Sequence, residues 1–166
     1  GLKRLSDYLP SGEAGEHGAG DRDDVVTVTF DMDTGPRKYL HFLNVCFSNG
    51  FQIWEVLDSD EQGSQATRET QPLREVVSVR QGYTHIVKVL STVPVAEDSP
   101  LHAKQPAVAV VAGDEPGDSN VVRLFSLPDN DYVHQIRFHG AVHAVTCNRH
   151  WMIVCLKNQL VLHVSK

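Results

Sequence analysis

Two apolar runs meet at a tight turn in the stretch Leu40-His-Phe-Leu-Asn-Val-Cys-Phe-Ser-Asn-Gly-Phe-Gln-Ile-Trp-Glu-Val-Leu57. Residues 40–47 form one run and residues 51–57 the other, and both contain β-branched and aromatic side chains, which favour strands. The Asn49-Gly50 pair between them is typical of a two-residue hairpin turn. This stretch therefore predicts two antiparallel strands.

Further strands are expected on both sides of this hairpin. Before it, Val26, Val28 and Phe30 alternate with threonines, which is the two-residue period of a strand. After it, the polar segment 58–72 is expected to be a surface loop, followed by a short strand at residues 74–79. Helix-length amphipathic patterns are absent from this whole region, so the fold class is predicted to be all-β.

The same order of elements recurs twice more along the chain. The strands expected in these two copies are residues 86–93, 107–111, 121–127 and 132–138, with a polar loop at 95–106, and then residues 141–147, 151–156 and 159–164. The third strands of the three copies are Phe51-Gln-Ile-Trp-Glu-Val56, Val122-Arg-Leu-Phe-Ser-Leu127 and Leu160-Val-Leu-His-Val-Ser165. In this alignment Ile53, Leu124 and Leu162 occupy one equivalent position, which is expected to be buried between neighbouring repeats.

Repetition of four-stranded units is the sequence signature of a β-propeller, whose blades recur about every 40–50 residues. A generic β-sandwich or barrel is the alternative fold. Propellers close with about 4 to 8 blades, and residues 25–166 supply a little under three. We therefore expect a WD40-like β-propeller, with roughly three blades of an incomplete ring in this chain. These would be the first blades of a longer protein.

The N-terminal residues 1–24 have a different character. Leu2, Leu5 and Leu9 can share one side of a short helix ended by Pro10, which predicts a docking helix. The segment from residue 11 to residue 24 is rich in glycine and acidic residues and predicts a flexible linker. The first 35 residues hold eight acidic and three basic side chains, so they carry most of the net charge of −6.

The composition narrows the function class. The 166 residues are 41% hydrophobic and 22% charged, as in an ordinary soluble domain, and no apolar run approaches the roughly 20 residues that cross a bilayer. Three cysteines without a C-x-x-C spacing indicate reduced thiols, which predicts a cytoplasmic protein. Binding to nucleic acid is not expected, because the chain is acidic and lacks clustered lysine and arginine.

Three motifs resemble ligand sites but favour plainer interpretations. His139, His143 and Cys147 are spaced by four, but on a strand each such step spans about 13 Å, too far for one metal ion. Asp31-Met-Asp-Thr-Gly35 opens like a calcium loop but lacks the later ligands, so a turn after a strand is expected. Gly18-Ala-Gly20 lacks the Lys and Ser or Thr of a phosphate-binding loop. No metal, cofactor or phosphate site is predicted.

Catalytic candidates are equally weak. Cys147 lies close in sequence to His143 and His150, but a buried cysteine in a strand is usually inert packing. Trp54 and Trp151 lie in apolar strands and are expected in the core rather than at a binding surface. The nine histidines are expected at the surface and in turns. The chain is therefore predicted to be non-catalytic, with no catalytic residue assigned.

Four short segments resemble one known family. They are Phe47-Ser-Asn-Gly-Phe-Gln-Ile-Trp54, Val77-Ser-Val-Arg-Gln-Gly82, Val122-Arg-Leu-Phe-Ser-Leu127 and Cys147-Asn-Arg-His-Trp-Met-Ile-Val154. Their order and rough spacing resemble the breast-carcinoma-amplified-sequence autophagy adaptors, and Trp54-Glu55 stands where WD repeats usually have Trp-Asp. The resemblance runs from about Leu5 to the C-terminus. It implies a WD-repeat propeller related to the PROPPIN phosphoinositide-binding group.

The resemblance also implies a function. It indicates a cytoplasmic scaffold that associates peripherally with autophagosomal membranes at the phagophore assembly site, through phosphoinositides and protein partners. PROPPINs bind the lipid head group with an Arg-Arg-Gly motif in later blades, and this chain has no adjacent arginine pair. No lipid-binding residue is therefore assigned here, and protein contacts are expected at the loops 58–72 and 95–106. A plain WD-repeat assembly subunit without lipid binding, or a propeller hydrolase with its site in the central channel, are the alternatives.

Overall fold

The computed structural model describes residues 24–34, 39–57, 72–91, 105–113, 119–148 and 150–164. Within these ranges the chain forms eleven strands, and no helix that could cross a membrane is found among them. The expected docking helix and most of the linker lie outside the described residues, as do nearly all of the loops 58–72 and 95–106. The all-β prediction is confirmed for the part of the chain that is described.

The first four strands form one antiparallel sheet in sequence order. They are β1 (Val25–Thr34), β2 (Tyr39–Phe47), β3 (Gly50–Val56) and β4 (Leu73–Arg80). The expected hairpin joins β2 to β3, because Phe47 lies opposite Gly50 and only two residues remain for the turn. The chain comes very close to itself at this point, since a Cβ on Gly50 would lie 2.0 Å from the Val79 carbonyl oxygen. Glycine is therefore required at this position by contact with β4.

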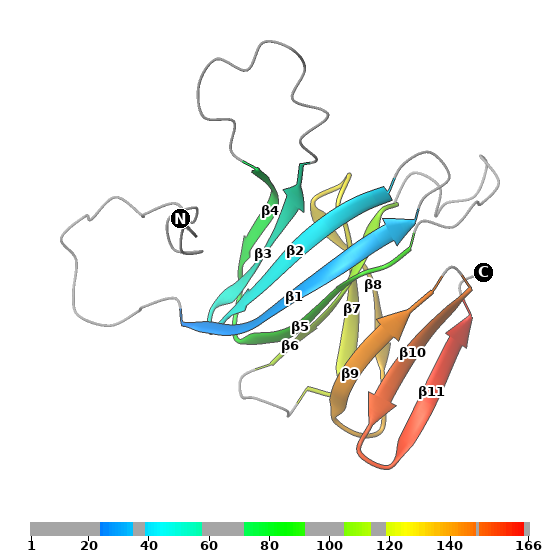
Figure 1. Cartoon of the computed structure of the whole chain (residues 1–166). Helices are drawn as coiled ribbons and strands as arrows, with labels where there is room; N and C mark the ends of the chain where they lie inside the picture. Colours follow the sequence, from blue (N-terminus) through cyan, green and yellow to red (C-terminus); the bar gives the residue numbers. More distant parts are fainter. Residues whose placement is uncertain are drawn as a thin grey trace, which may run out of the picture.

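The remaining strands repeat this pattern. The second sheet contains β5 (Thr84–Val89), β6 (Ala107–Ala112), β7 (Val121–Ser126) and β8 (Asp131–Arg137), and the third contains β9 (Val142–Cys147), β10 (Trp151–Leu156) and β11 (Gln159–Val164). Every pairing within the three sheets is antiparallel. Figure 1 shows the sheets side by side, and β5 contacts both β1 and β9. The first strands of the three sheets are therefore neighbours, as in successive propeller blades.

A core cluster fills the space between the first two sheets. Phe51 and Ile53 of β3 face Phe125 of β7, and the Phe51 and Phe125 rings meet edge to face with their centroids 5.8 Å apart. The Tyr132 ring also meets the Phe125 ring edge to face, with the centroids 5.2 Å apart. The buried members of this cluster are Phe42, Cys46, Phe51, Ile53, Val77, Val87, Val89, Val108, Val110 and Phe125.

A second core cluster joins the second sheet to the third. Its buried members are Ala109, Val111, Val122, Phe138, Val142, Val145, Met152, Val154 and Leu156. Leu124 of β7 packs against this cluster, whereas its neighbour Phe125 belongs to the first core. Alternate residues of β6 thus serve two different cores, which explains the continuous apolar sequence of this strand.

The three third-strand positions are equivalent, but their burial differs. Ile53 is buried, Leu124 is half-buried, and Leu162 is 57% exposed, so the predicted burial of Leu162 is wrong. Ile53 packs in the core toward the second sheet and Leu124 against the core toward the third, whereas no described residue continues the stack beyond β11. Leu162 therefore has nothing described to pack against, although its place in the repeat is as expected.

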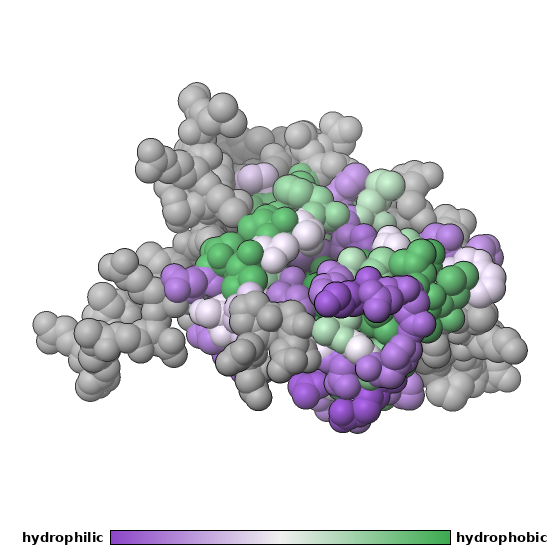
Figure 2. Space-filling view, turned by 90° about the horizontal axis from the view of Figure 1, so that it is seen from below, coloured by the Kyte–Doolittle hydropathy of each residue, from purple (hydrophilic) through white to green (hydrophobic). Residues whose placement is uncertain are grey.

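Trp151 is exposed for the same reason. It lies with Leu160 and Leu162 on the free face of the third sheet and is 39% exposed, so its predicted core position is wrong. Trp54 is buried as expected, in a cluster with Leu43 and other residues on the face of the first sheet that points away from the second. In Figure 2 hydrophobic surface gathers in two areas of the underside, one of them on the side of β10 and β11.

Leu124→Ala is expected to lower the free energy of unfolding of the full-length protein by about 2 kcal/mol, the lower end of the range for buried leucines. The loss arises because the half-buried side chain packs on the second core. His134 lies opposite Leu124 on β8 and is exposed, so His134→Ala should change stability by less than about 0.5 kcal/mol. Urea unfolding of both variants measures the difference. Equal effects would contradict the assigned packing.

Candidate functional site

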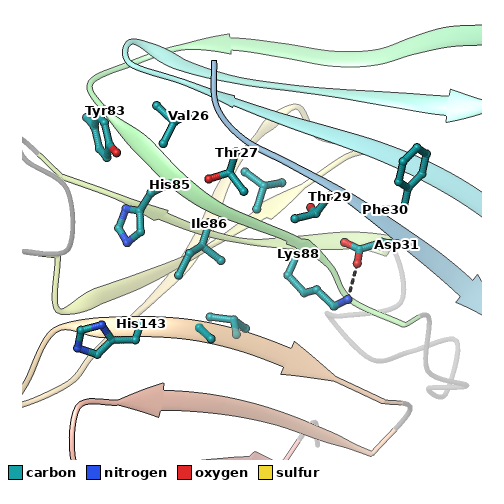
Figure 3. A pocket seen from close by; sticks show the side chains of 13 residues that line it. Val26, Thr27, Thr29, Phe30, Asp31, Tyr83, His85, Ile86, Lys88 and His143 are labelled. Carbon is teal, nitrogen blue, oxygen red and sulfur yellow. Dashed lines mark hydrogen bonds and ion pairs between the residues drawn. The ribbon is translucent and has the colours of Figure 1, made fainter. Parts of the chain in front are cut away.

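A pocket of about 620 Å³ lies along the first strands of the three sheets. Its lining comes from β1, the segment Tyr83–Lys88 that includes most of β5, and β9 (Figure 3). Each of these strands is the edge of its sheet, so one row of its backbone groups is not used in sheet pairing. The volume falls within the range of about 300–1,000 Å³ that is usual for ligand pockets. We take this pocket as the candidate functional site.

Aromatic and imidazole rings form one end of the pocket. The Tyr83 and His85 rings lie 6.0 Å apart and are tilted by 31°, and His143 of β9 lies nearby (Figure 3). Both ring nitrogens of His85 are buried, and neither has a hydrogen-bond partner of normal geometry. Burial lowers the pKa of His85 below its ordinary value of 6.5; the Val142 backbone opposes this shift, and the charge of His143 adds to it. The His85 ring is therefore neutral at physiological pH.

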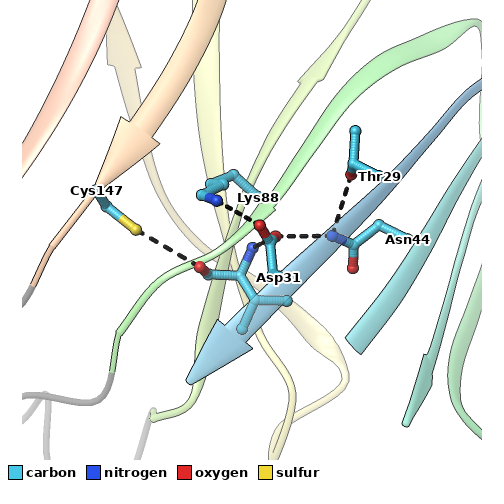
Figure 4. Close-up of polar contacts among 6 residues, drawn as sticks. Thr29, Asp31, Asn44, Lys88 and Cys147 are labelled. Carbon is cyan, nitrogen blue, oxygen red and sulfur yellow. Dashed lines mark hydrogen bonds and ion pairs between the residues drawn. The ribbon is translucent and has the colours of Figure 1, made fainter. Parts of the chain in front are cut away.

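A buried carboxylate forms the other end of the pocket. Asp31 of β1 accepts hydrogen bonds from the Val89 N–H and from the side chain of Asn44, both at 2.7 Å, and it forms an ion pair with Lys88 (Figure 4). The Asn44 side-chain nitrogen also lies 3.3 Å from the Thr29 hydroxyl. Asp31 and Asn44 come from the first sheet, whereas Lys88 and Val89 come from the second. We call this group of five residues the inter-sheet polar junction.

The predicted turn that begins at Asp31 is not found. Asp31-Met-Asp-Thr-Gly35 was expected to form a turn, but Asp31 to Thr34 continue strand β1. The Asp31 side chain is almost fully buried and satisfied by three donors, so this carboxylate is a structural group here rather than an exposed turn residue. Gly35 lies outside the described residues.

The histidine and cysteine candidates do not form a shared site. His143 and Cys147 lie on strand β9 as expected, and His139 precedes the strand and contacts Gln159. The Cys147 thiol donates to the Val89 carbonyl at 3.5 Å, and burial raises its pKa. In the described ranges no three histidine, cysteine or acidic side chains come together as metal ligands.

His150 and Cys46 also lie away from the pocket. His150 lies just before β10, where its backbone N–H donates to the Asn148 side chain. Burial raises the pKa of Cys46 to about 12, so its thiol stays protonated. Neither residue lines the pocket.

Sequence reasoning missed the pocket and its two polar ends. The expectation that histidines lie at the surface is wrong for His85, whose ring nitrogens are buried. The alternation in β1 gave no signal for Asp31, because it placed Asp31 on the face of Thr27 and Thr29, opposite the apolar residues. In the structure Asp31 is buried, whereas Val28 and Phe30 are exposed. The Lys88 partner of Asp31 comes from another repeat, so a single repeat does not identify it.

Comparison with known families gives one match over most of the chain. The family "BCAS3, WD40 repeat" matches residues 22–165. Among curated proteins, Autophagy-related protein 18f of Arabidopsis thaliana is 26% identical over 121 residues, which cover 63% of this chain and 14% of that protein. The chain therefore spans only a small part of the length of this relative.

Solved structures support the same fold. Hsv2 of Kluyveromyces marxianus superposes with a TM-score of 0.54 at 15% identity, covering 86% of this chain and 36% of that one. Hsv2 of Kluyveromyces lactis gives a TM-score of 0.56 at 12% identity, covering 87% of this chain and 34% of that one. At this identity the likeness concerns the fold alone. It agrees with the propeller architecture that the three repeats predicted.

Proposed function

Because the chain belongs to the BCAS3 WD40-repeat family, we propose that it forms part of a non-catalytic propeller scaffold that acts in autophagy. The observation that carries this proposal is the family match over residues 22–165, together with a relative named for autophagy. The scaffold is a cytoplasmic protein that associates peripherally with phagophore membranes, through phosphoinositides and through protein partners.

The chemistry of the described residues supports a scaffold more than an enzyme. Hydrolysis by a cysteine requires an accessible thiolate beside a base. The Cys147 thiol instead donates a hydrogen bond to the Val89 carbonyl, and burial raises the pKa of the thiol. At the pocket, the Asp31 carboxylate is already occupied by three donors and is not free to orient a histidine. The blades therefore act as rigid supports in this proposal.

Lipid binding is assigned to parts of the protein outside this chain. The chain carries a net charge of −6 and has no adjacent arginine pair. Its described cations are distributed over several strands, with Arg74 and Arg80 on β4, Arg123 on β7 and Arg137 on β8. Attraction of a basic residue to an anionic membrane contributes only about 1 kcal/mol, so dispersed cations on an acidic chain give weak binding.

Liposome flotation tests this proposal. Residues 1–166 alone are expected not to float with vesicles containing phosphatidylinositol 3-phosphate. The full-length protein is expected to float with them, but not with vesicles of unphosphorylated phosphatidylinositol. Replacing an arginine pair in the later blades should abolish the flotation.

Two outcomes would change the assignment. Strong flotation of residues 1–166 would place the lipid site in this chain. Failure of the full-length protein to float would instead favour a WD-repeat assembly subunit without lipid binding.

A further inference from the structure

The ring of His85 lies where the second and third sheets meet. The register of β5 against β6 shifts between Thr84 and Ile86, so His85 is the extra residue of a bulge. A bulge re-aims the side chain of its extra residue, and the His85 ring points from β5 toward β9, where His143 lies (Figure 3). We propose that His85 is a pH-sensitive contact, whose protonation weakens the packing of the third sheet on the second.

The backbone on both sides of the ring is held in place. The Gly113 N–H donates to the Tyr83 carbonyl at 2.9 Å. The Val142 N–H, at the start of β9, donates to the Ser119 carbonyl at the same distance. Between them both nitrogens of the His85 ring are buried, and neither has a hydrogen-bond partner of normal geometry. An uncompensated charge costs far more to bury than a neutral polar group, so protonation favours states in which the ring reaches water.

The titratable and charged groups around His85 come from three strands. In the described lining of the pocket they are Tyr83 and Lys88 on the β5 segment, Asp31 on β1 and His143 on β9. Asp31 is paired with Lys88 at the other end of the pocket, so its carboxylate is not available to His85. A positive charge on His143 opposes a second one on His85. The β6 residues paired on either side of the bulge are apolar.

The direction of the pH effect follows from the buried position of the ring. Burial lowers the pKa of His85 below its ordinary value of 6.5. A histidine whose pKa is lowered by folding binds its proton more weakly in the folded protein than after opening. The contribution of the ring to stability is therefore complete above pH 6.5 and is lost as the pH falls below that value. The boundary between β5 and β9 should open more readily in acid.

Hydrogen exchange read by mass spectrometry tests the proposal on the full-length protein at about pH 7.5 and about pH 5.5, on either side of the ordinary histidine pKa. Exchange rates are divided by those of the unfolded chain at the same pH, which removes the pH dependence of the exchange chemistry. Protection of the peptide that contains β9 is expected to fall at least about threefold in acid, whereas the peptide that contains β2 should keep its protection.

Two results of this measurement would overturn the proposal. One is unchanged protection of β9 in acid. This is the result expected if an acidic residue of the β6–β7 connection, namely Asp114, Glu115 or Asp118, neutralised the charged ring; these three lie outside the described residues. The other is an equal loss of protection in the β9 and β2 peptides, which would indicate a general effect of acid.

Variants assign the effect to His85. His85→Phe keeps an aromatic ring beside Tyr83 but binds no proton, so β9 should keep its protection at both pH values. His85→Gln is a second neutral replacement and should behave in the same way. His134→Phe removes an exposed histidine of β8 and should keep the wild-type loss. A loss that persists in a folded His85 variant, or that disappears in His134→Phe, would overturn the proposal.

Discussion

Replacing Asp31 by alanine is expected to lower the free energy of unfolding of the full-length protein by about 3–5 kcal/mol, the usual cost of removing one partner of a buried ion pair. The carboxylate accepts from Lys88, from the Val89 N–H and from Asn44, and the loss leaves all three without their acceptor. Lys88 can turn its ammonium group toward the pocket, but the Val89 N–H is fixed by the backbone. Chemical denaturation of the purified variant measures the change.

Two further variants separate the polar junction from general effects of losing an acid. Asp131 is exposed, and its carboxylate accepts a hydrogen bond from the adjacent Tyr132 N–H, so Asp131→Ala should cost less than about 1 kcal/mol. Combining Asp31→Leu with Lys88→Met replaces the ion pair by apolar groups and should be less damaging than Asp31→Ala. A loss below about 1 kcal/mol for Asp31→Ala would show that the junction contributes little.

Gly50→Ala is expected to destabilise the protein by at least about 3 kcal/mol, which is large for the addition of one methyl group. The new Cβ would lie 2.0 Å from the Val79 carbonyl oxygen, and that oxygen belongs to the backbone of the paired strand β4. The φ of Gly50 is +153°, which alanine rarely adopts. The β3–β4 pairing would have to open, and thermal unfolding should detect the loss.

Gly140→Ala is the matched control for this effect. A Cβ on Gly140 would meet no atom within 4 Å. The substitution should therefore change the free energy of unfolding by less than about 0.5 kcal/mol, with a small gain from the stiffer unfolded chain. Similar losses in both variants would indicate a general sensitivity to replacing glycine, and would contradict the close approach between Gly50 and β4.

The repeating strands were predictable because strand formation depends on local pattern. The alternation Val26-Thr-Val-Thr-Phe30 and the Asn49-Gly50 turn both report on neighbours within a few residues. The third-strand alignment placed Ile53 and Leu124 in equivalent positions, and the sheets confirm it. The existence and order of the strands could therefore be derived without any knowledge of how the sheets pack.

The candidate site was not predictable in the same way. Asp31 and Lys88 are 57 positions apart in the chain, and only the stacking of one sheet on the next brings them together. The environment of His85 could not be predicted either, because its burial depends on β9. The exposure of Trp151 and Leu162 likewise depends on what lies beyond the third sheet. Each of these contacts and exposures depends on how two neighbouring repeats pack, so the sequence of one repeat does not predict it.

The inter-sheet polar junction has a consequence for how the protein unfolds. In repeat proteins stability is approximately the sum of a term for each unit and a term for each interface between neighbours. A buried acceptor shared across one interface makes that interface term large, because separating the two units leaves a desolvated charge on one side and unpaired donors on the other. The first two units should therefore open as one cooperative block in hydrogen exchange, with the Val89 amide among the slowest to exchange.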